Sequence, residues 1–578
     1  MKYKITILLL ASLSFAGCTG DFEEMNTSPS HAVKTSPAYV LPYIQERTMH
    51  ISATEGYQTT EELYTQQYCQ YFTNTNSNFL TDRYAYNNDW AMDFWDPYFK
   101  ALKHVKALKG ELDEHPEYTN IVQMLRIVTA NATIAMTDIF GDLPYSEAGL
   151  GVDGPAYDSQ KDIYYDIFKE LTEASSILAQ NLSGQDVCDE DTDLFFAGDI
   201  DKWRKFANSL RLRCALRIVY VDPDKAKAEG EAAIADGLME SNADNVSLRI
   251  IGHKWGHPLA QTAPFNDFRM SRTMENILKN TSSVADPRRE LWFGVTANYM
   301  KKYVLRTEPD LVYKGEAFSG VPNGVPVTEF SAADEDGWIE YHVDNNSRPY
   351  GLQFFPDWNS GNVTNADATL PLPCTRRFKV MGYPEVCLLK SEAALREWAG
   401  AGDAKANYIE GIRASFETER DGVDASLYST ENDETYINTG DVAWVDGGGL
   451  DVNLEKIAVQ KWLAVYPYSM EAWAECRRTG FPELTPVLQS DDPDIDSSKN
   501  EFVRKIRYSD AERRDNAQHA SDLSLKEDTK LVVTVKVIHH LYDRAVALVC
   551  CVIQDCTVTV GYQLIPLWCC VGVGWKLL

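Results

Sequence analysis

The sequence predicts a mainly α-helical protein, in which a scaffold of helical hairpins carries a loop-rich, irregular subdomain. Two observations predict this fold class. Apolar residues recur at steps of three and four in several segments long enough for helices. Between residues 241 and 375 this period fades, and Gly, Pro, Asn, Asp and aromatic residues dominate. Because a loop region of this length is uncommon in a compact domain without a function, we expect ligand binding there.

The composition excludes several classes of protein. The chain has 578 residues, of which 44% are hydrophobic and 11% aromatic, so it can form a large core and does not fit a disordered chain. Its formal net charge is −30, and Lys and Arg are not clustered. Binding to nucleic acid or to anionic lipid head groups is therefore not expected.

Residues 1–17 have the pattern of a secretory signal peptide that ends at a lipidation site. Lys2 and Lys4 precede an apolar run, and Phe-Ala-Gly then leads into Cys18, which resembles a bacterial lipobox. We therefore expect Cys18 to become the lipidated first residue, with residues 18–36 as a flexible tether. Several acyl chains on one cysteine would hold a soluble body at a membrane surface. A signal peptide without lipidation is the alternative.

Residues 37–240 are predicted to form an N-terminal helical scaffold. The apolar period predicts four helices, which cover residues 119–140, 162–182, 201–221 and 224–236. Gly141 is expected to end the first helix, because glycine readily adopts the backbone conformation that follows a helix. Pro223 is expected to separate the last two, because proline cannot continue a helix.

Residues 376–520 are predicted to complete the helical body. Two amphipathic helices flank the segment AGAGD, where glycines end the first helix and Asp403 can cap the second. Such hairpins resemble tetratricopeptide repeats, although no strict repeat consensus is present. A final long helix is expected over residues 454–478. Arg477 and Arg478 at its end are expected to bind carbonyl groups or to pair with acidic residues of the scaffold.

Six ordered segments, together with the lipobox, resemble the SusD/RagB family of outer-membrane nutrient-binding lipoproteins of Bacteroidetes. The resemblance runs from about residue 18 to about residue 517. The segments are DFEEMNTSP after Cys18, TDIFGDLPYSEA (137–148), KWRKFANSLRLRCALRI (202–218), DPRRELWF (286–293), YPEVCLLKSEAALREW (383–398) and QKWLAVYPYSMEAWAECRRTGFPEL (460–484).

The resemblance implies a tetratricopeptide-like scaffold with an irregular subdomain. It also implies a position on the cell surface, as a lid on a SusC-like TonB-dependent transporter in the outer membrane. The implied ligand is an oligosaccharide or, in some members, a peptide, and no cofactor is implied. Ligand residues of the family lie in variable loops without a motif to match, so none is transferred to this sequence.

Three segments, residues 76–90, 338–350 and 358–365, combine the groups that a sugar requires. A sugar ring presents C–H groups on one face and hydroxyls at its rim, so it needs an aromatic plane together with amides, carboxylates or Arg. The candidate ligand residues are Asp82, Arg83, Tyr84, Asn88, Trp90, Trp338, Tyr341, Asn346, Arg348, Trp358 and Asn359. The alternative is that loop aromatics fix irregular backbone to the scaffold, which is the role expected for Trp95 and Tyr98.

Catalysis is not predicted. The GxSxG, HExxH and glycine-rich phosphate motifs are missing from the sequence. Asp138 and Asp142 are expected to cap a helix end and fix a turn. His253 and His257 have the spacing of metal ligands on a helix, but Gly256 and a following proline favour a loop, so no metal site is expected.

Several alternatives stay open at this point. The chain could bind a peptide instead of a glycan, since both ligand types occur in the family that it resembles. It could also be a lipid-anchored glycan hydrolase, because paired carboxylates can cleave glycosides and acidic residues are abundant. A purely structural helical-repeat subunit of an envelope complex is the third possibility.

Residues 521–578 differ in character from the rest of the chain. They contain five cysteines and few acidic residues, and they lack the helical period of the scaffold. We interpret them as a frameshifted or otherwise aberrant C-terminus, with genuine divergence as the alternative. A membrane span is a poor fit because of Pro566, several glycines and frequent β-branched residues.

Overall fold

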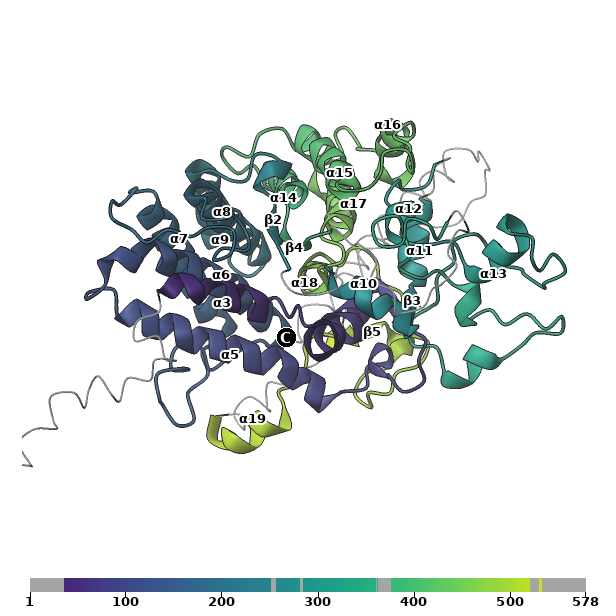
Figure 1. Cartoon of the computed structure of the whole chain (residues 1–578), viewed down its shortest axis with the longest axis horizontal. Coiled ribbons are helices and arrows are strands. Elements are labelled where there is room, and N and C mark those ends of the chain that lie inside the picture. The colour runs from purple at the N-terminus through teal and green to yellow at the C-terminus, as the bar shows by residue number, and fades with distance from the viewer. Residues whose placement is uncertain are drawn as a thin grey trace, which may run out of the picture. The chain divides into compact units, whose positions relative to one another are not determined.

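The computed structural model describes residues 36–250, 256–280, 284–359, 361, 376–519 and 530–532. The chain divides into two units, Met1–Leu531 and Val532–Leu578, and the features below belong to the first, apart from the last residue of strand β6. Helices dominate the described residues, so the predicted mainly α fold class is confirmed (Figure 1). The signal peptide, Cys18, nearly all of the tether and nearly all of the C-terminal tail lie outside these residues.

Helices α5 to α9 pack in chain order, each against the next, and α3 packs against α5 and α6 (Figure 1). Gly141 ends the long helix α6 with a φ of +84°, as predicted. The Asp222 carboxylate accepts from the Lys225 amide and caps α9, whose first residue is Pro223. These helices are α3 (Leu41–Thr48), α4 (Gln66–Tyr68), α5 (Asn88–Gly110), α6 (Thr119–Phe140), α7 (Gln160–Leu178), α8 (Ile200–Arg217) and α9 (Pro223–Asp236).

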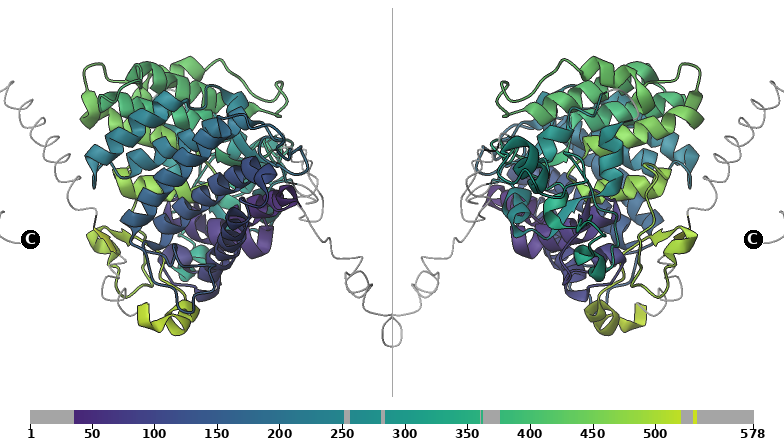
Figure 2. Two further views of the ribbon diagram at one scale, coloured as in Figure 1. Left: turned by 90° about the vertical axis from the view of Figure 1, so that its left-hand side faces the viewer. Right: turned by 90° about the vertical axis from the view of Figure 1, so that its right-hand side faces the viewer.

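Among the C-terminal helices, α14 to α17 lie along the opposite edge of the helical body from α3 and α5, whereas α19 lies on the same side as α5 (Figure 1 and Figure 2). The predicted hairpin is confirmed: α14 and α15 pack together, and the Asp403 side chain accepts from the Ala406 amide at 2.7 Å. These helices are α14 (Tyr383–Leu395), α15 (Ala404–Arg420), α16 (Asp433–Asn438), α17 (Gly449–Ala464), α18 (Ser469–Thr479) and α19 (Asp510–Asp515).

Two expectations about helices are wrong. The single helix predicted over residues 454–478 is two helices, α17 and α18, because Pro467 between them has no amide hydrogen to continue the helix. Trp95 and Tyr98 lie on α5 and not in irregular backbone. Helix α5 runs through Pro97 and buries both aromatic rings in the core.

The described residues between 241 and 361 form only short elements, as expected for a loop-rich region. Strand β1 (Phe72–Asn74) pairs antiparallel with β3 (Phe268–Met270), which joins the segment to the N-terminal part. Strand β2 (Val246–Leu248) pairs antiparallel with β4 (Phe378–Met381). The helices of the loop-rich segment are α10 (Pro258–Thr262), α11 (Arg272–Lys279), α12 (Arg289–Trp292) and α13 (Ala297–Tyr299). Two further strands, β5 (Glu501–Val503) and β6 (Lys530–Val532), lie near the end of the described chain.

No helix among the described residues is both long enough and apolar enough to cross a membrane.

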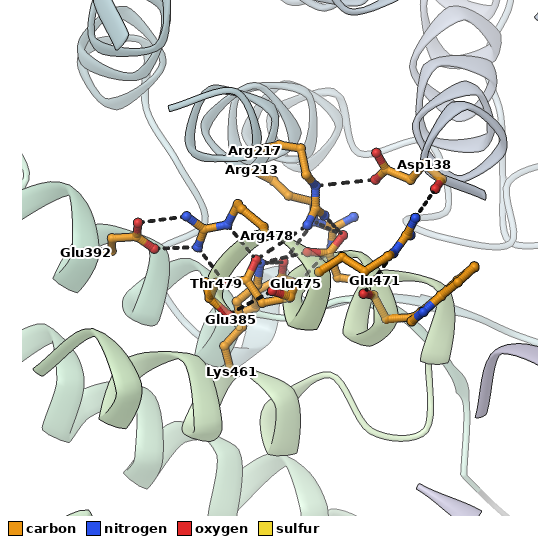
Figure 3. A network of polar contacts seen from close by, with 12 residues as sticks. Asp138, Arg213, Arg217, Glu385, Glu392, Lys461, Glu471, Glu475, Arg478 and Thr479 are labelled. Atoms are coloured by element: carbon orange, nitrogen blue, oxygen red, sulfur yellow. Dashed lines mark hydrogen bonds and ion pairs between the residues drawn. The ribbon is translucent and has the colours of Figure 1, made fainter. Parts of the chain in front are cut away.

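A buried network of charged side chains joins four helices (Figure 3). Arg213 on α8 donates to both carboxylate oxygens of Glu385 on α14, at 2.8 and 2.7 Å. Arg217, one turn further along α8, donates to Glu471 on α18 at 2.6 Å. Lys461 on α17 donates to the same Glu471 at 2.7 Å. These side chains are at most 9% exposed, so the charges interact with little screening by water.

The same network continues along α18. Arg478 donates to both oxygens of Glu392 on α14, at 2.8 and 2.6 Å, and to Glu475 one turn back at 2.5 Å. Lys461 also reaches Glu475, at 3.1 Å. The expectation that Arg478 pairs with acidic residues of the scaffold is confirmed. We call these residues, together with those of the preceding paragraph, the buried ion network.

The network keeps its carboxylates ionised. Burial alone would raise the pKa of Glu471, but Arg217, Lys461 and Arg213 outweigh it and lower this pKa from 4.5 to about 2. For Glu475, Arg478 and Lys461 likewise outweigh burial and lower the pKa well below its usual range. Both glutamates are therefore charged at neutral pH.

Glu61 is another buried glutamate, but its pKa is raised instead of lowered. Glu61 lies in an unusual π-helical segment, Ala53–Thr65, and is fully buried. Its carboxylate accepts from the amide and the hydroxyl of Ser469, at 3.0 and 3.1 Å. Burial nevertheless dominates and raises the pKa of Glu61 from 4.5 to about 8, so this side chain is mainly protonated at neutral pH.

Replacing Glu471 by Gln should destabilise the fold strongly. The substitution leaves Arg217 and Lys461 buried without their shared carboxylate, which typically costs about 3–5 kcal/mol. We expect this loss in the free energy of unfolding measured with urea. The matched control is Glu434→Gln, which breaks an ion pair with Arg413 in which both side chains are about half exposed, and there a loss of less than about 1 kcal/mol is expected. Equal losses in the two variants would contradict this account of the network.

Replacing Glu61 by Gln should flatten the dependence of stability on pH. Because the folded-state pKa of Glu61 is raised to about 8, the folded protein holds a proton that the unfolded chain releases near 4.5, and stability falls as the pH rises between these values. Melting temperatures at pH 5 and pH 8 measure the effect. We expect a smaller difference between the two pH values in Glu61→Gln than in the wild type, and no change in the exposed control Glu335→Gln. An unaltered pH dependence in Glu61→Gln would count against a protonated Glu61.

Candidate ligand-binding surface

Four aromatic side chains gather in the loop-rich segment and form what we call the tyrosine–tryptophan surface: Tyr299, Tyr303, Tyr313 and Trp338. The rings of Tyr299 and Tyr303 are 4.9 Å apart between centroids. Tyr313 lies 6.2 Å from each of them, and Trp338 meets Tyr313 edge-on at 5.2 Å. Tyr303 is 47% exposed, and Tyr299 and Trp338 are half-buried, so three of the rings reach the surface.

A short helical turn positions the two exposed tyrosines. Thr296 caps α13, and its hydroxyl accepts from the Tyr299 amide. Tyr303 follows four residues later in the adjoining turn, so the two rings lie on the same side. The hydroxyls of Thr296 and Tyr313 are 2.6 Å apart, which fixes Tyr313 beneath them. Burial raises the pKa of Tyr313 to about 12, so its hydroxyl remains protonated.

The loop that carries Trp338 is held by ion pairs. The Asp334 carboxylate accepts from the Trp338 amide at 2.9 Å. The Lys314 ammonium donates to Asp334 and to Asp336, at 2.6 Å each. This arrangement keeps the indole next to Tyr313 and places charged groups beside the aromatic rings. Flat rings with hydrogen-bonding groups at their edge are what a sugar ring requires.

The candidate residues of the first predicted segment mostly face the protein. Tyr84 is 5% exposed, and its ring packs against Tyr68 in the core. Asp82 is buried and accepts from the Gly324 amide at 3.1 Å, and burial raises its pKa to about 7. Arg83 forms an ion pair with Asp491 through two hydrogen bonds. The proposed ligand surface below therefore leaves out Asp82, Arg83 and Tyr84.

Asn88 and Trp90 lie at the start of α5. Both are half-buried. The Asn88 side chain accepts from the Asp510 amide at 2.8 Å, and the Trp90 ring lies 5.6 Å from Phe79. Part of each side chain is open to solvent, so ligand contact by these two residues stays a prediction.

Of the remaining candidates, two hold the tyrosine–tryptophan surface from behind. Trp358 is 9% exposed and donates its indole N–H to the Val295 carbonyl at 2.8 Å. The Asn359 side chain accepts from the Val295 amide at 2.9 Å. Val295 immediately precedes Thr296, which caps α13. Trp358 and Asn359 therefore position the backbone that carries Tyr299.

Three further candidates lie in the same loops. The Arg348 guanidinium stands over the rings of Tyr350 and Trp358, at 5.4 and 5.8 Å from their centroids. Asn346 is buried and donates to the carbonyl of Glu340 at 2.8 Å. Tyr341 is half-buried, and burial raises its pKa. For Asn346 and Arg348 the observed interactions are with the protein itself, and ligand contact by Tyr341 stays a prediction.

The sequence reasoning missed three members of the surface: Tyr299, Tyr303 and Tyr313. Tyr299 and Tyr303 stand four residues apart in ANYMKKYV, a spacing that places two rings together on a helical turn. This spacing could have identified the pair from the sequence. The proximity of Tyr313 and Trp338 could not be predicted in this way, because it depends on how the two loops meet.

Three other residues discussed in the sequence analysis, Asp138, Asp142 and Arg477, bind other parts of the protein. The Asp138 carboxylate accepts from the Tyr164 hydroxyl at 2.7 Å and lies 3.3 Å from Arg217, so the expectation that it caps a helix end is wrong. The Asp142 carboxylate accepts from the amide of Gln160, the first residue of α7, as expected of a residue that fixes a turn. Arg477 donates to the carbonyls of Asp138 and Arg504, as predicted.

His257 has a structural role as well. It is buried, and its ring accepts from the Leu259 amide at the start of α10. Burial lowers its pKa well below 6.5, so the ring is neutral. His253 lies outside the described residues. Within the described part of the chain, no group of three or more His, Cys, Asp or Glu side chains is placed to hold a metal ion.

A family model supplies the first comparison with known proteins. Residues 29–508 match the SusD-like family that is described as "Starch-binding associating with outer membrane". This range includes the described helices from α3 to α18 and the whole tyrosine–tryptophan surface. No curated protein sequence matches the chain.

Solved structures supply the second comparison. A chitin-binding SusD homologue from Flavobacterium johnsoniae is 26% identical, with a TM-score of 0.66, and the match covers 85% of this chain and 96% of that one. A SusD homologue from Parabacteroides distasonis is 23% identical, with a TM-score of 0.69, and the match covers 84% of this chain and 94% of that one. The latter supports the fold alone. Because the family model extends over most of the sequence and the fold agrees, this chain belongs to the SusD/RagB family, as the sequence motifs predicted.

Proposed function

We propose that this protein is a cell-surface glycan-binding lipoprotein that captures an oligosaccharide on the tyrosine–tryptophan surface. Tyr303, Tyr299 and Trp338 would stack against the C–H faces of sugar rings. Lys314, Asp334 and Asp336 beside them would meet the hydroxyls. The observation that carries this proposal is the group of partly exposed rings around Tyr303, held rigidly from behind.

Two findings support a glycan as the ligand. The family is described as starch-binding, and the homologue from Flavobacterium johnsoniae, 26% identical, is described as chitin-binding. Polar ligands at open aromatic surfaces gain little net free energy, because their hydroxyls already bind water. We therefore infer modest affinity at each stacking position, and stronger binding of longer chains that occupy several positions.

We further infer the cellular context. The family description supports association with the outer membrane. Lipidation of Cys18 would anchor the protein there, and the residues after Cys18 would tether the helical body. A SusC-like TonB-dependent transporter would receive the captured glycan. In this proposal the protein binds the glycan and does not cleave it.

Replacing Tyr303 or Trp338 by Ala should weaken glycan binding. Loss of one stacking ring is expected to cost about 0.5–1.5 kcal/mol, or roughly 2- to 13-fold in Kd. Isothermal titration with oligosaccharides of starch and chitin measures the effect, with Tyr39→Ala as the control because Tyr39 is 67% exposed and lies near α3. Release of reducing sugars in the same samples would instead support the hydrolase alternative, and binding of peptides but not glycans would support the peptide alternative.

Replacing Cys18 by Ser should release the protein from the membrane. Serine cannot form the thioether that carries the lipid, so the variant should move from the membrane fraction to the soluble fraction. Fractionation of cells that express the full chain, with mass spectrometry of the N-terminal peptide, measures this. The control is Cys188→Ser, which changes a half-buried thiol in the helical scaffold. Retention of Cys18→Ser in the membrane fraction would refute the predicted lipid anchor.

A further inference from the structure

A cavity lies on the helical scaffold, between the ends of α6 and α8, the start of α7, and α18. Its volume is about 480 Å³, which is within the range of small-molecule sites. Its walls include Tyr164, Tyr165, Tyr220 and Val221. None of these residues belongs to the tyrosine–tryptophan surface, so the cavity is a separate feature of the molecule.

The floor of this cavity is cationic. Arg217, Arg477 and Arg478 line it, next to Asp138. Arg217 and Arg478 are paired with carboxylates of the buried ion network (Figure 3). Arg477 differs from them: its hydrogen bonds go to the main-chain carbonyls of Asp138 and Arg504, at 2.5 and 2.7 Å, and to that of Trp473.

The charge of Arg477 is therefore incompletely balanced. Its Nη2 atom is buried and has no hydrogen-bond partner among the described residues. Burial and the nearby Arg217 lower the pKa of Arg477 to about 10, although the Asp138 carboxylate opposes them, so the guanidinium is still charged at neutral pH. A buried, unsatisfied donor on a charged group is costly, and an anion in the cavity would offset that cost.

The walls suit a ring-shaped ligand. Tyr164 donates to Asp138, and Tyr165 donates to Asp222, which fixes both rings in place. The ammonium groups of Lys161 and Lys225 stand over the Tyr165 ring, at 5.3 and 5.4 Å from its centroid. The cavity thus combines aromatic walls with the ammonium of Lys161 at its rim and three guanidinium groups at its floor. Two carboxylates, Asp138 and Asp222, also line it, and each accepts a hydrogen bond from a tyrosine hydroxyl of the walls.

We propose that this cavity is a second saccharide site, specific for a sugar that carries a carboxylate, that is, a uronic acid residue. The carboxylate faces the arginine floor, and the pyranose ring lies against the tyrosine walls. The inference rests on the proposed function only in taking the ligand to be a sugar. The site on the tyrosine–tryptophan surface binds neutral rings by stacking, whereas this site selects for charge.

Titration of the full mature chain with glucuronic acid and with glucose tests the proposal. A carboxylate that pairs with the floor should make glucuronic acid bind about tenfold or more tightly than glucose, and this advantage should shrink as the salt concentration rises. Equal binding of the two sugars would overturn the proposal. Tighter binding of a short peptide with a free C-terminal carboxylate than of glucuronic acid would overturn the assignment to a sugar.

A substitution at the rim locates the site. Val221 lines the cavity and is 83% exposed, so Val221→Trp should obstruct the cavity without disturbing the core. We expect it to weaken binding of glucuronic acid about tenfold or more, and Val187→Trp, at a residue that is 86% exposed and outside the cavity, to leave binding unchanged. Unaltered melting temperatures verify that both variants fold.

The outcomes separate this inference from the proposed function. If Val221→Trp binds glucuronic acid as the wild type does, the cavity is not the site, whatever the tyrosine–tryptophan surface does. Failure of the proposed function would appear elsewhere, as neutral oligosaccharide binding that is insensitive to Tyr303→Ala and Trp338→Ala. Neither pair of variants changes a residue of the other site.

Discussion

The buried ion network is the interaction on which the arrangement of the helices depends. Its charges come from α8, from α14 and from the consecutive helices α17 and α18, so segments distant in the chain meet in it. Placing such charges in the interior is costly, and only nearly complete pairing offsets that cost. A shift of any one of these helices by a turn would leave a charge without its partner. We therefore infer that the network selects one packing of the helices, more than it adds net stability.

This rigid packing has a consequence for the loops. The loop-rich segment is fixed at both ends by short antiparallel pairs, β1 with β3 and β2 with β4. Within it, Trp358 and Asn359 bind the two main-chain polar groups of Val295. The backbone that carries the tyrosine–tryptophan surface is therefore fixed before a ligand binds, so binding costs little conformational entropy. Residues that do not touch a ligand still set its binding geometry.

The sequence predicted the helices well where one apolar period runs between clear ends, as in α6 before Gly141. The prediction of one helix over residues 454–478 failed because the apolar pattern does not stop at Pro467. The expectation of irregular backbone at Trp95 and Tyr98 failed because both rings pack in the core on α5, which continues through Pro97. For the candidate site the prediction failed differently. Tyr84 and Tyr303 both lie among polar residues, yet one is 5% and the other 47% exposed. Local sequence gives the chemistry of a side chain, whereas its exposure depends on which distant segments cover it.

The formal net charge of −30 should repel an acidic sugar that approaches the cavity on the scaffold. That repulsion acts over distance, and salt at physiological concentration screens exposed charges beyond roughly 8 Å. Inside the cavity, Arg217, Arg477 and Arg478 outnumber the nearby carboxylate of Asp138, and these charges are largely buried and so are screened less. The overall acidity would slow the approach of an anion, whereas the arginine floor would determine how strongly it is held. A net negative protein and a site for a negative ligand are therefore physically compatible.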